Sequence, residues 1–330
     1  MKSFKILFNG FRHGHIFALY KRVAASSLTE VAGCIEQNAE ARAQAEAKLG
    51  ISFSDECYEK WLASDIDAVA VGGAYGERGA VIIKALEAGK HVIADKPVCT
   101  TRKELETIRA LCAQKSLTVA CMLDLRYLPQ ALTAKRILDS GRLGAIRNIA
   151  FNGQHCIDYA NRPAWYFEEG MHGGTLNDLS IHGVDLVRML TGQEIVRVDA
   201  ARVWNSYAVK HKDFKDSAML MARLESGAGV LADVSYSAPS QVFSMPTYWE
   251  FRVWCEKGLL SFSFTDSAVT LYEEGSAAPV RIEGESDGES YLTEFLSEIQ
   301  NGTGTVTENV LRSTETALML QETADKEWQK

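Results

Sequence analysis

The chain has 330 residues, 46% of them hydrophobic, with a formal net charge of −8 and a pI near 5.5. This length predicts two domains with a sizeable core. The acidic balance, with no block rich in Lys and Arg, argues against a nucleic-acid-binding protein because phosphates would be repelled. It favours chemistry on a small molecule.

Seven cysteines are scattered along the chain and never form a C-x-x-C pair. This usage is typical of reduced thiols in a cytosolic enzyme rather than of a disulfide frame or a zinc site. Residues 1–9 alternate as a strand and lack the apolar core of a signal peptide. No apolar run approaches the ~20 residues that span a bilayer. We therefore expect a cytoplasmic protein.

The first third of the chain alternates strand and helix patterns. Short apolar runs predict strands at 3–9, 30–36, 67–71, 91–94 and 117–122. The patterns between them predict helices at 14–25, 38–48, 77–88 and 101–114. Such alternation predicts βαβ units and a doubly wound parallel sheet covered on both faces.

After about residue 124 the pattern changes to long extended runs. Helices are expected at 128–139, 178–190, 289–300 and 306–325, and strands at 146–155, 195–204, 216–224, 228–237, 248–254, 258–264 and 268–273. Strands without helices between them predict a large open, mainly antiparallel sheet. The fold class is therefore α/β, with a dinucleotide-binding domain at 1–123 and an α+β domain at 124–330 that would bind substrate and mediate oligomers. The last helices could pack back on the first domain.

The segment from Gly10 to Gly14 lies where the first strand turns into the first helix. Glycine there lets the backbone approach a pyrophosphate, which the helix N-terminus then stabilises. The full G-x-G-x-x-G spacing is missing, because Arg12 stands where a second glycine is expected. The Arg12 side chain either contacts phosphate or points to solvent, and His13 and His15 pack at this loop.

Glu36 ends the second predicted strand, about 20 residues past the loop. A carboxylate there can bind both ribose hydroxyls and repels a 2′-phosphate, which favours NAD(H) over NADP(H). The alternative is a solvated carboxylate at a strand end.

A glycine pair, Gly173-Gly174, opens a helical pattern that carries Asp178 and His182 four positions apart. Residues at this spacing share one helix face. A carboxylate beside an imidazole fixes its tautomer and stabilises its charged form, as proton transfer near neutral pH requires. The alternative reading is a capping aspartate and a histidine satisfied within the core.

Three motifs in this order resemble the Gfo/Idh/MocA family of oxidoreductases over nearly the whole chain. They are the run 85–97 ending in Ala94-Asp95-Lys96-Pro97, then Arg126-Tyr127-Leu128-Pro129 followed by 139–144, and Gly173-Gly174 with Asp178, His182 and Asp185. The resemblance implies a Rossmann domain, a second domain whose sheet mediates dimers or tetramers, and NAD(P)-dependent oxidation of a hydroxyl on a sugar, polyol or cyclitol.

By position, the resemblance implies that Lys96 is the active-site lysine, that Pro97 follows it with a cis or strained bond, and that Asp178 and His182 handle the proton. Together with the residues read from the local patterns, this gives three sets of candidates. The catalytic candidates are Lys96, Asp178 and His182; the cofactor-binding candidates are Gly10, Arg12, His13, Gly14, Glu36, Gly73, Asp95, Lys96 and Pro97; the substrate-binding candidates are Arg126, Tyr127, Trp165, His172 and Asp185. The chain departs from the family pattern at Asp95, which replaces the usual glutamate, and at His172, which adds an imidazole before the glycine pair. It also departs at 72–75, where Gly-Gly-Ala-Tyr replaces a frequent Thr-Pro pair.

Oxidation of a carbinol requires a base on the hydroxyl. In our first hypothesis His182 takes the proton, Asp178 orients the ring, and Lys96 stabilises the developing alkoxide. Alternatively, Lys96 is the base, with its pKa lowered by burial. Lys96 from the first domain and His182 from the second are expected to meet on one oxygen.

Several secondary assignments stay open at this stage. Asp185 contacts substrate or pairs with Arg188, and Trp165 stacks on a sugar or anchors the fold. Arg126 positions the substrate or the nearby helix. No metal site is expected from His155, His172 and His182, because no ligand spacing recurs.

The sequence thus predicts an NAD-dependent dehydrogenase of a sugar, glycoside or cyclitol, working as a homodimer or homotetramer. One alternative is a glycoside hydrolase or lyase in which NAD⁺ transiently oxidises the sugar at C3. A second is a regulator that senses a sugar or nucleotide without turnover, which would be expected to lack the lysine or the histidine. The chain has both.

Overall fold

The computed structural model describes residues 3–328 and divides into two compact units. Unit 1 comprises residues 1–122, 170–173 and 290–314, and unit 2 comprises residues 123–169, 174–289 and 315–330. No helix within the described residues is long and apolar enough to cross a membrane.

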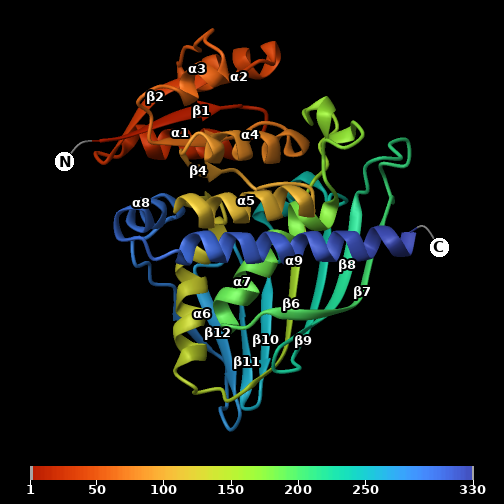
Figure 1. Ribbon diagram of the computed structural model, residues 1–330. Helices are drawn as coiled ribbons and strands as arrows, with labels where there is room; N and C mark the ends of the chain where they lie inside the picture. The colour runs from red at the N-terminus through yellow and green to blue at the C-terminus, as the bar shows by residue number, and fades with distance from the viewer. Residues whose placement is uncertain (1–2, 329–330) are drawn as a thin grey trace. The chain divides into compact units, whose positions relative to one another are not determined.

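Unit 1 contains a five-stranded parallel sheet in the order β2-β1-β3-β4-β5 (Figure 1). Its strands are β1 (Phe4–Asn9), β2 (Thr29–Ile35), β3 (Ala68–Val71), β4 (His91–Ala94) and β5 (Val119–Cys121). Its helices are α1 (His15–Ala25), α2 (Ala39–Leu49), α3 (Tyr58–Leu62), α4 (Tyr75–Glu87), α5 (Arg102–Lys115) and α8 (Tyr291–Asn301). The predicted parallel sheet is confirmed; α3 was not predicted.

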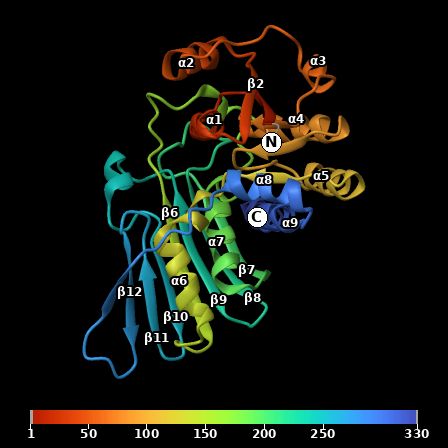
Figure 2. The ribbon, with the colours of Figure 1, turned by 90° about the vertical axis from the view of Figure 1, so that its left-hand side faces the viewer.

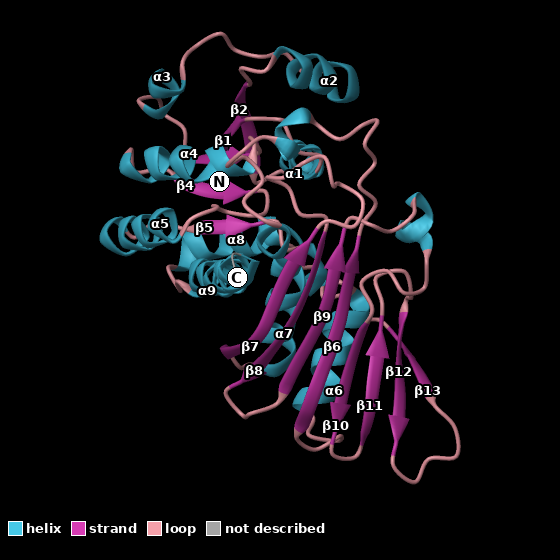
Figure 3. Ribbon diagram, turned by 90° about the vertical axis from the view of Figure 1, so that its right-hand side faces the viewer, coloured by secondary structure: helices cyan, strands magenta, loops and turns pink. Residues whose placement is uncertain are grey.

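Helices cover both faces of this sheet, so its central strands are apolar throughout. Figure 3 shows α4 and α5 side by side on one side of the strands and α1 on the other. All four residues of β3 are fully buried, as expected for a parallel strand packed on both faces. The strand ends of β1, β3 and β4 therefore meet at one edge, where their following loops lie close together.

Unit 2 contains an eight-stranded sheet in the order β13-β12-β11-β10-β6-β9-β8-β7. Its strands are β6 (Ile146–Gln154), β7 (Ile195–Trp204), β8 (Ser217–Leu224), β9 (Gly229–Ser235), β10 (Phe251–Cys255), β11 (Gly258–Phe262), β12 (Ala268–Glu273) and β13 (Val280–Glu283). The pairs are antiparallel except β6 with β9, which run parallel. The mainly antiparallel sheet is confirmed, while the edge strand β13 was missed.

Two helices, α6 (Pro129–Asp139) and α7 (Ile181–Thr191), lie along one face of this sheet (Figure 2). Gly183 lets α7 approach closely, because a Cβ there would meet the Phe151 ring at 2.1 Å. The opposite face is turned to the viewer in Figure 3, with α6 and α7 behind the strands. The long helix α9 (Thr305–Trp328) begins in unit 1 and ends in unit 2.

Short helical turns complete unit 2. They are η1 (Asp124–Tyr127), η2 (Ala164–Phe167), η3 (Leu176–Ser180) and η4 (Ser240–Ser244). The η3 segment is a π-helical turn that runs directly into α7. The predicted helix at 178–190 therefore starts earlier and with a wider first turn than an α-helix.

Candidate functional site

The loop after β1 is built around Gly10, whose φ of +90° favours glycine. A Cβ on Gly10 would lie 2.5 Å from the Gly73 nitrogen, so the loops after β1 and β3 touch through their backbones. The Arg12 N–H also donates to the Gly72 carbonyl at 3.0 Å. Close backbone approach before the first turn of α1 suits a pyrophosphate, so the residues present fit a dinucleotide.

Glu36 follows β2 and is buried, with its carboxylate turned to the glycine loop. It accepts hydrogen bonds from the backbone N–H groups of Phe11 (2.6 Å) and Asn38 (2.7 Å). A carboxylate offers about four acceptor positions, so these two bonds still leave capacity for hydroxyl donors. Because Glu36 is buried, its carboxylate is not the solvated side chain at a strand end that the alternative reading describes.

Arg12 lies beside Glu77 at the start of α4, with Nη1 3.4 Å from each carboxylate oxygen. Its side chain is partly exposed. The guanidinium therefore has a carboxylate partner, a third arrangement that neither reading of the sequence included.

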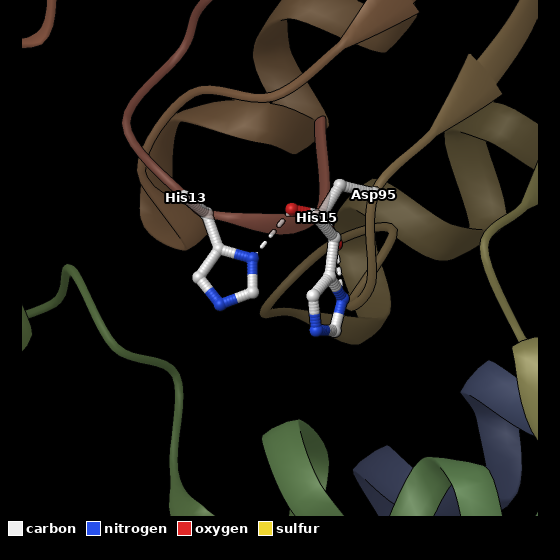
Figure 4. A group of neighbouring side chains, drawn as sticks. All are labelled: His13, His15 and Asp95. Atoms are coloured by element: carbon white, nitrogen blue, oxygen red, sulfur yellow. Dashed lines mark hydrogen bonds and ion pairs between the residues drawn. The ribbon is translucent and has the colours of Figure 1, made fainter. Parts of the chain in front are cut away.

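A polar cluster follows β4. Asp95 is fully buried, and its Oδ2 accepts from His13 Nδ1 (2.5 Å) and from Arg78 Nη2 (3.0 Å). His15 Nδ1 lies 3.2 Å from the other oxygen (Figure 4). Asp95 thus accepts hydrogen bonds from the glycine loop and from α4, and a histidine of α1 lies beside its other oxygen.

Arg78, which has 0% exposure, connects the loops after β3 and β4. Besides Asp95 it donates to the carbonyls of Gly73 (2.9 Å), Pro97 (3.2 Å) and Lys96. Four hydrogen bonds satisfy this buried cation, as burial of a charge requires. Sequence reasoning missed Arg78, although it falls at helical spacing with buried Tyr75, Ile82 and Ala85, so a charge on that apolar stripe was the available signal.

Burial and charge set the protonation states in this cluster. Burial acts to raise the pKa of Asp95, but His13, Arg78 and His15 outweigh it and hold that pKa well below its usual range. Burial lowers the pKa of His13 to about 3, against the opposing effect of Asp95. Asp95 is therefore ionised and His13 neutral near pH 7.

Lys96 and Pro97 follow Asp95 directly, and the bond between them is cis. Lys96 is buried, and its Nζ lies 5.8 Å from the centre of the Tyr75 ring. His172 belongs to the same unit, with its ring 5.7 Å from that of Tyr75. Unit 1 thus brings Lys96, Arg78, His13 and His172 around one tyrosine.

Asp178 and His182 lie in unit 2, in the π-helical turn and the first turn of α7, and both are buried. The His182 ring meets the Trp249 ring edge-on at 5.6 Å. Trp249 has a φ of +49°, which is uncommon for a bulky residue and often found near functional sites. π-turns are also frequent at such sites.

Asp185 lies one turn further along α7, and its Oδ2 is 3.4 Å from Arg126 Nε of η1. Arg188 makes a two-pronged ion pair with Glu194, with both contacts at 2.7 Å. Arg126 thus contacts α7, the helix that carries His182. Tyr127 completes the same η1 turn.

Trp165 has 2% exposure, and its ring centre lies 4.3 Å from that of Tyr166. This is the arrangement of a packing anchor. Stacking on a sugar would require the 156–168 loop to open.

The candidate residues therefore form two groups. In unit 1 the group includes Gly10, Arg12, His13, Gly14, Glu36, Gly73, Asp95, Lys96, Pro97 and His172, and in unit 2 it includes Arg126, Tyr127, Trp165, Asp178, His182 and Asp185. Within the described residues the close set of potential metal ligands is His13, His15 and Asp95, a set that sequence reasoning did not identify.

Comparisons with known proteins agree with this architecture. Residues 5–122 match the model of an oxidoreductase family with an NAD-binding Rossmann fold, and residues 131–261 match the GFO/IDH/MocA C-terminal domain. An inositol dehydrogenase homolog from Azotobacter vinelandii, solved with NAD⁺, superposes with a TM-score of 0.80 at 17% identity, covering 98% of this chain and 96% of that one. At that identity the likeness shows the fold alone.

Two curated relatives match parts of the chain. The scyllo-inositol 2-dehydrogenase (NAD⁺) of Bacillus subtilis is 30% identical over 66% of this chain and 64% of its own length. The levoglucosan dehydrogenase of Pseudarthrobacter phenanthrenivorans is 27% identical over 48% of this chain and 42% of its own length. The chain thus covers less than two thirds of the length of either relative. With both domain models matched in order, the chain belongs to the GFO/IDH/MocA family of oxidoreductases, whose N-terminal domain has the NAD-binding Rossmann fold.

Proposed function

We propose that this protein is an NAD(H)-dependent dehydrogenase that oxidises or forms a hydroxyl-bearing carbon of a sugar, glycoside or cyclitol. The observation that carries the proposal is the buried Lys96, one residue past a buried carboxylate at the same sheet edge as the glycine loop. Relatives named as inositol and levoglucosan dehydrogenases support the substrate class.

The coenzyme would be held by the loop from Gly10 to Gly14 and by the Glu36 carboxylate. When bound, the nicotinamide supplies the acceptor for the carbon-bound hydrogen and its electron pair. We propose NAD(H) rather than NADP(H), because the buried carboxylate of Glu36 would repel a 2′-phosphate at the end of β2.

The proposed chemistry divides between two kinds of side chain. The Lys96 ammonium donates a hydrogen bond to the substrate oxygen and stabilises the charge that develops when its proton leaves. His182 takes that proton, and Asp178 orients its ring and stabilises the imidazolium. Arg126, Tyr127, His172 and Asp185 would contact or orient the polyol, with Trp165 supporting their loop.

A homodimer or homotetramer formed through the open face of the unit 2 sheet completes the proposal. Large apolar side chains are exposed on alternate positions of that face, namely Met219, Met221, Leu231 and Trp254. Sedimentation of wild type and of the Met221→Glu variant tests this contact, with a shift to monomer expected in the variant. Seven free cysteines support a reducing, cytoplasmic location.

The activity test is a screen of NAD⁺ and NADP⁺ reduction over inositols, aldoses and glycosides. Wild type should reduce NAD⁺ with at least one polyol, and the Lys96→Ala variant should lose most of that rate. Lys103→Ala removes an exposed lysine of α5 and serves as the matched control. Purified protein that carries stoichiometric NAD⁺ and releases the aglycone of a glycoside, without net NADH, would instead indicate the hydrolase alternative.

A further inference from the structure

The cluster around Asp95 contains a carboxylate–imidazole pair that the mechanism above does not use. His13 Nδ1 and Asp95 Oδ2 are 2.5 Å apart, a short charge-assisted hydrogen bond. An ionised carboxylate only accepts, so the proton of this bond lies on His13 Nδ1. The pair thus has the form of a carboxylate that fixes a histidine tautomer.

Arg78 supports the assignment of this proton to His13 Nδ1. Its guanidinium is permanently charged, fully buried and 3.0 Å from the same Asp95 oxygen. It therefore stabilises the ionised carboxylate without any charge on His13. The neutral ring, protonated on Nδ1, has its lone pair on Nε2.

The same atoms are a poor site for a metal ion. Nitrogen and oxygen ligands of one zinc ion lie about 2.0–2.2 Å from it, so two ligands in tetrahedral positions are roughly 3.3 Å apart. His13 Nδ1 and Asp95 Oδ2 are closer than that, at 2.5 Å. Arg78 already occupies the carboxylate, and Lys96 adds a second cation one residue away. A divalent ion would be repelled by both.

The geometry turns the second nitrogen of His13 away from Asp95 (Figure 4). The side chain keeps 12% exposure. It lies in the loop after β1, next to the loop after β4, at the edge of a parallel sheet where ligands bind. The centre of the Tyr75 ring lies 5.2 Å from that of the His13 ring and 5.8 Å from Lys96 Nζ.

We propose that His13 is a ligand-binding residue whose Nε2 accepts a hydrogen bond from a hydroxyl group of a bound sugar ring. A hydroxyl both donates and accepts, so an imidazole acceptor and the Lys96 donor are complementary to such a ring. The ring is either the ribose next to the nicotinamide or the polyol substrate. This inference rests on the proposed function, because the coenzyme ribose and the polyol are the ligands that the proposed dehydrogenase binds.

Two substitutions separate the roles of the two ring nitrogens. In His13→Asn the amide can take the place of Nδ1 and donate to Asp95, but the side chain ends short of Nε2. In His13→Gln the amide oxygen can reach the Nε2 position, but the bond to Asp95 is lost. Both variants are compared with wild type for NADH affinity by fluorescence titration and for KM and kcat on the polyol found in the screen.

We expect His13→Asn to weaken one of these two quantities about three- to tenfold, the effect of one uncharged hydrogen bond. His13→Gln should stay within about twofold of wild type in the same quantity. A weaker NADH affinity assigns the hydroxyl to the coenzyme ribose, and a raised KM with unchanged NADH affinity assigns it to the substrate.

Three results would overturn the inference. His13→Asn could match wild type in both quantities, or His13→Gln could be the weaker variant, which would make His13 a support for Asp95. Stoichiometric metal in the purified protein, lost in His13→Asn, would show a metal ligand. If the wild-type protein binds neither NADH nor NADPH, that result would instead contradict the proposed function, and this inference with it.

Discussion

The two units hold their reactive side chains in different ways. In unit 1, the loops after β3 and β4 are tied together by the buried side chain of Arg78, which donates to Gly73 in one loop and to Asp95 and Pro97 in the other. In unit 2, Asp178 and His182 are carried by a single helix that begins with a π-turn and is fixed on the sheet through Gly183. The stability of unit 1 should therefore fall when a single polar side chain is lost. Substitutions at Asp178 or His182 in unit 2 should mainly lower the rate of the reaction.

The largest effect is expected from His182→Ala. Loss of the proposed proton acceptor should lower turnover by about 10²–10⁴ while NADH affinity stays within about twofold of wild type. Steady-state rates and fluorescence titration measure the two quantities. His211→Ala, on another loop of unit 2, is the control, and an unchanged turnover in His182→Ala would exclude the role.

Arg78→Met tests the dependence of unit 1 on one side chain. It leaves Asp95 buried with its charge no longer compensated by the guanidinium, so the free energy of unfolding should fall by about 3–5 kcal/mol. Urea denaturation measures it. The exposed Lys21→Met should change the free energy of unfolding by less than ~0.5 kcal/mol.

A double variant tests the same interaction further. Adding Asp95→Asn to Arg78→Met removes the buried charge and should recover part of the lost stability. A loss below ~1 kcal/mol in Arg78→Met would show that Arg78 does not hold the loops.

The neutral state of His13 predicts a pH dependence of stability. Its pKa is lowered to about 3 in the folded protein, mainly by burial, whereas an unfolded histidine titrates near 6.5. The unfolded chain therefore binds the extra proton below about pH 6.5, and the stability present above that pH is lost as pH falls. Between pH 7 and pH 5 this group alone should cost about 2 kcal/mol.

Urea denaturation at the two pH values measures this difference, with His13→Gln as the comparison. The variant should show a smaller loss between pH 7 and pH 5 than wild type. Equal losses would mean that His13 is not held neutral.

The smallest effect concerns coenzyme choice. Glu36→Gln removes the charge expected to repel a 2′-phosphate, so the ratio of kcat/KM for NADP⁺ to that for NAD⁺ should rise about tenfold, equal to ~1.4 kcal/mol. Glu30→Gln, on an exposed position of β2, should leave the ratio unchanged. A ratio unaffected by Glu36→Gln would remove the basis for preferring NAD(H).

Local patterns predicted most elements, because apolar runs and helical spacing are read within one segment. The parallel pairing of β6 with β9 was not predicted, since strand neighbours are chosen across long stretches of chain. The π-turn at 176–180 leaves the apolar spacing almost unchanged and so escaped notice. The short α3 and the edge strand β13 carry too few residues for a clear period.

The candidate site was predictable to a similar extent. Lys96, Asp178 and His182 were proposed from motifs, and His15 was placed at the cofactor loop without its contact to Asp95. Arg78 was missed, because its partner Asp95 lies in another loop, 17 positions further along the chain. The carboxylate–imidazole pair predicted from spacing was Asp178 with His182. The structure shows a hydrogen-bonded pair of that kind between Asp95 and His13, which are 82 positions apart.

The most direct test of the proposed chemistry follows the hydrogen on the carbinol carbon. Purified protein would be incubated with NAD⁺ and perdeuterated inositol or glucose, and the coenzyme examined by mass spectrometry. The account predicts one deuterium in the nicotinamide ring of each NADH formed, and its near disappearance in Lys96→Ala. A wild-type protein that binds NAD⁺ yet transfers no deuterium from any polyol of the screen would contradict it.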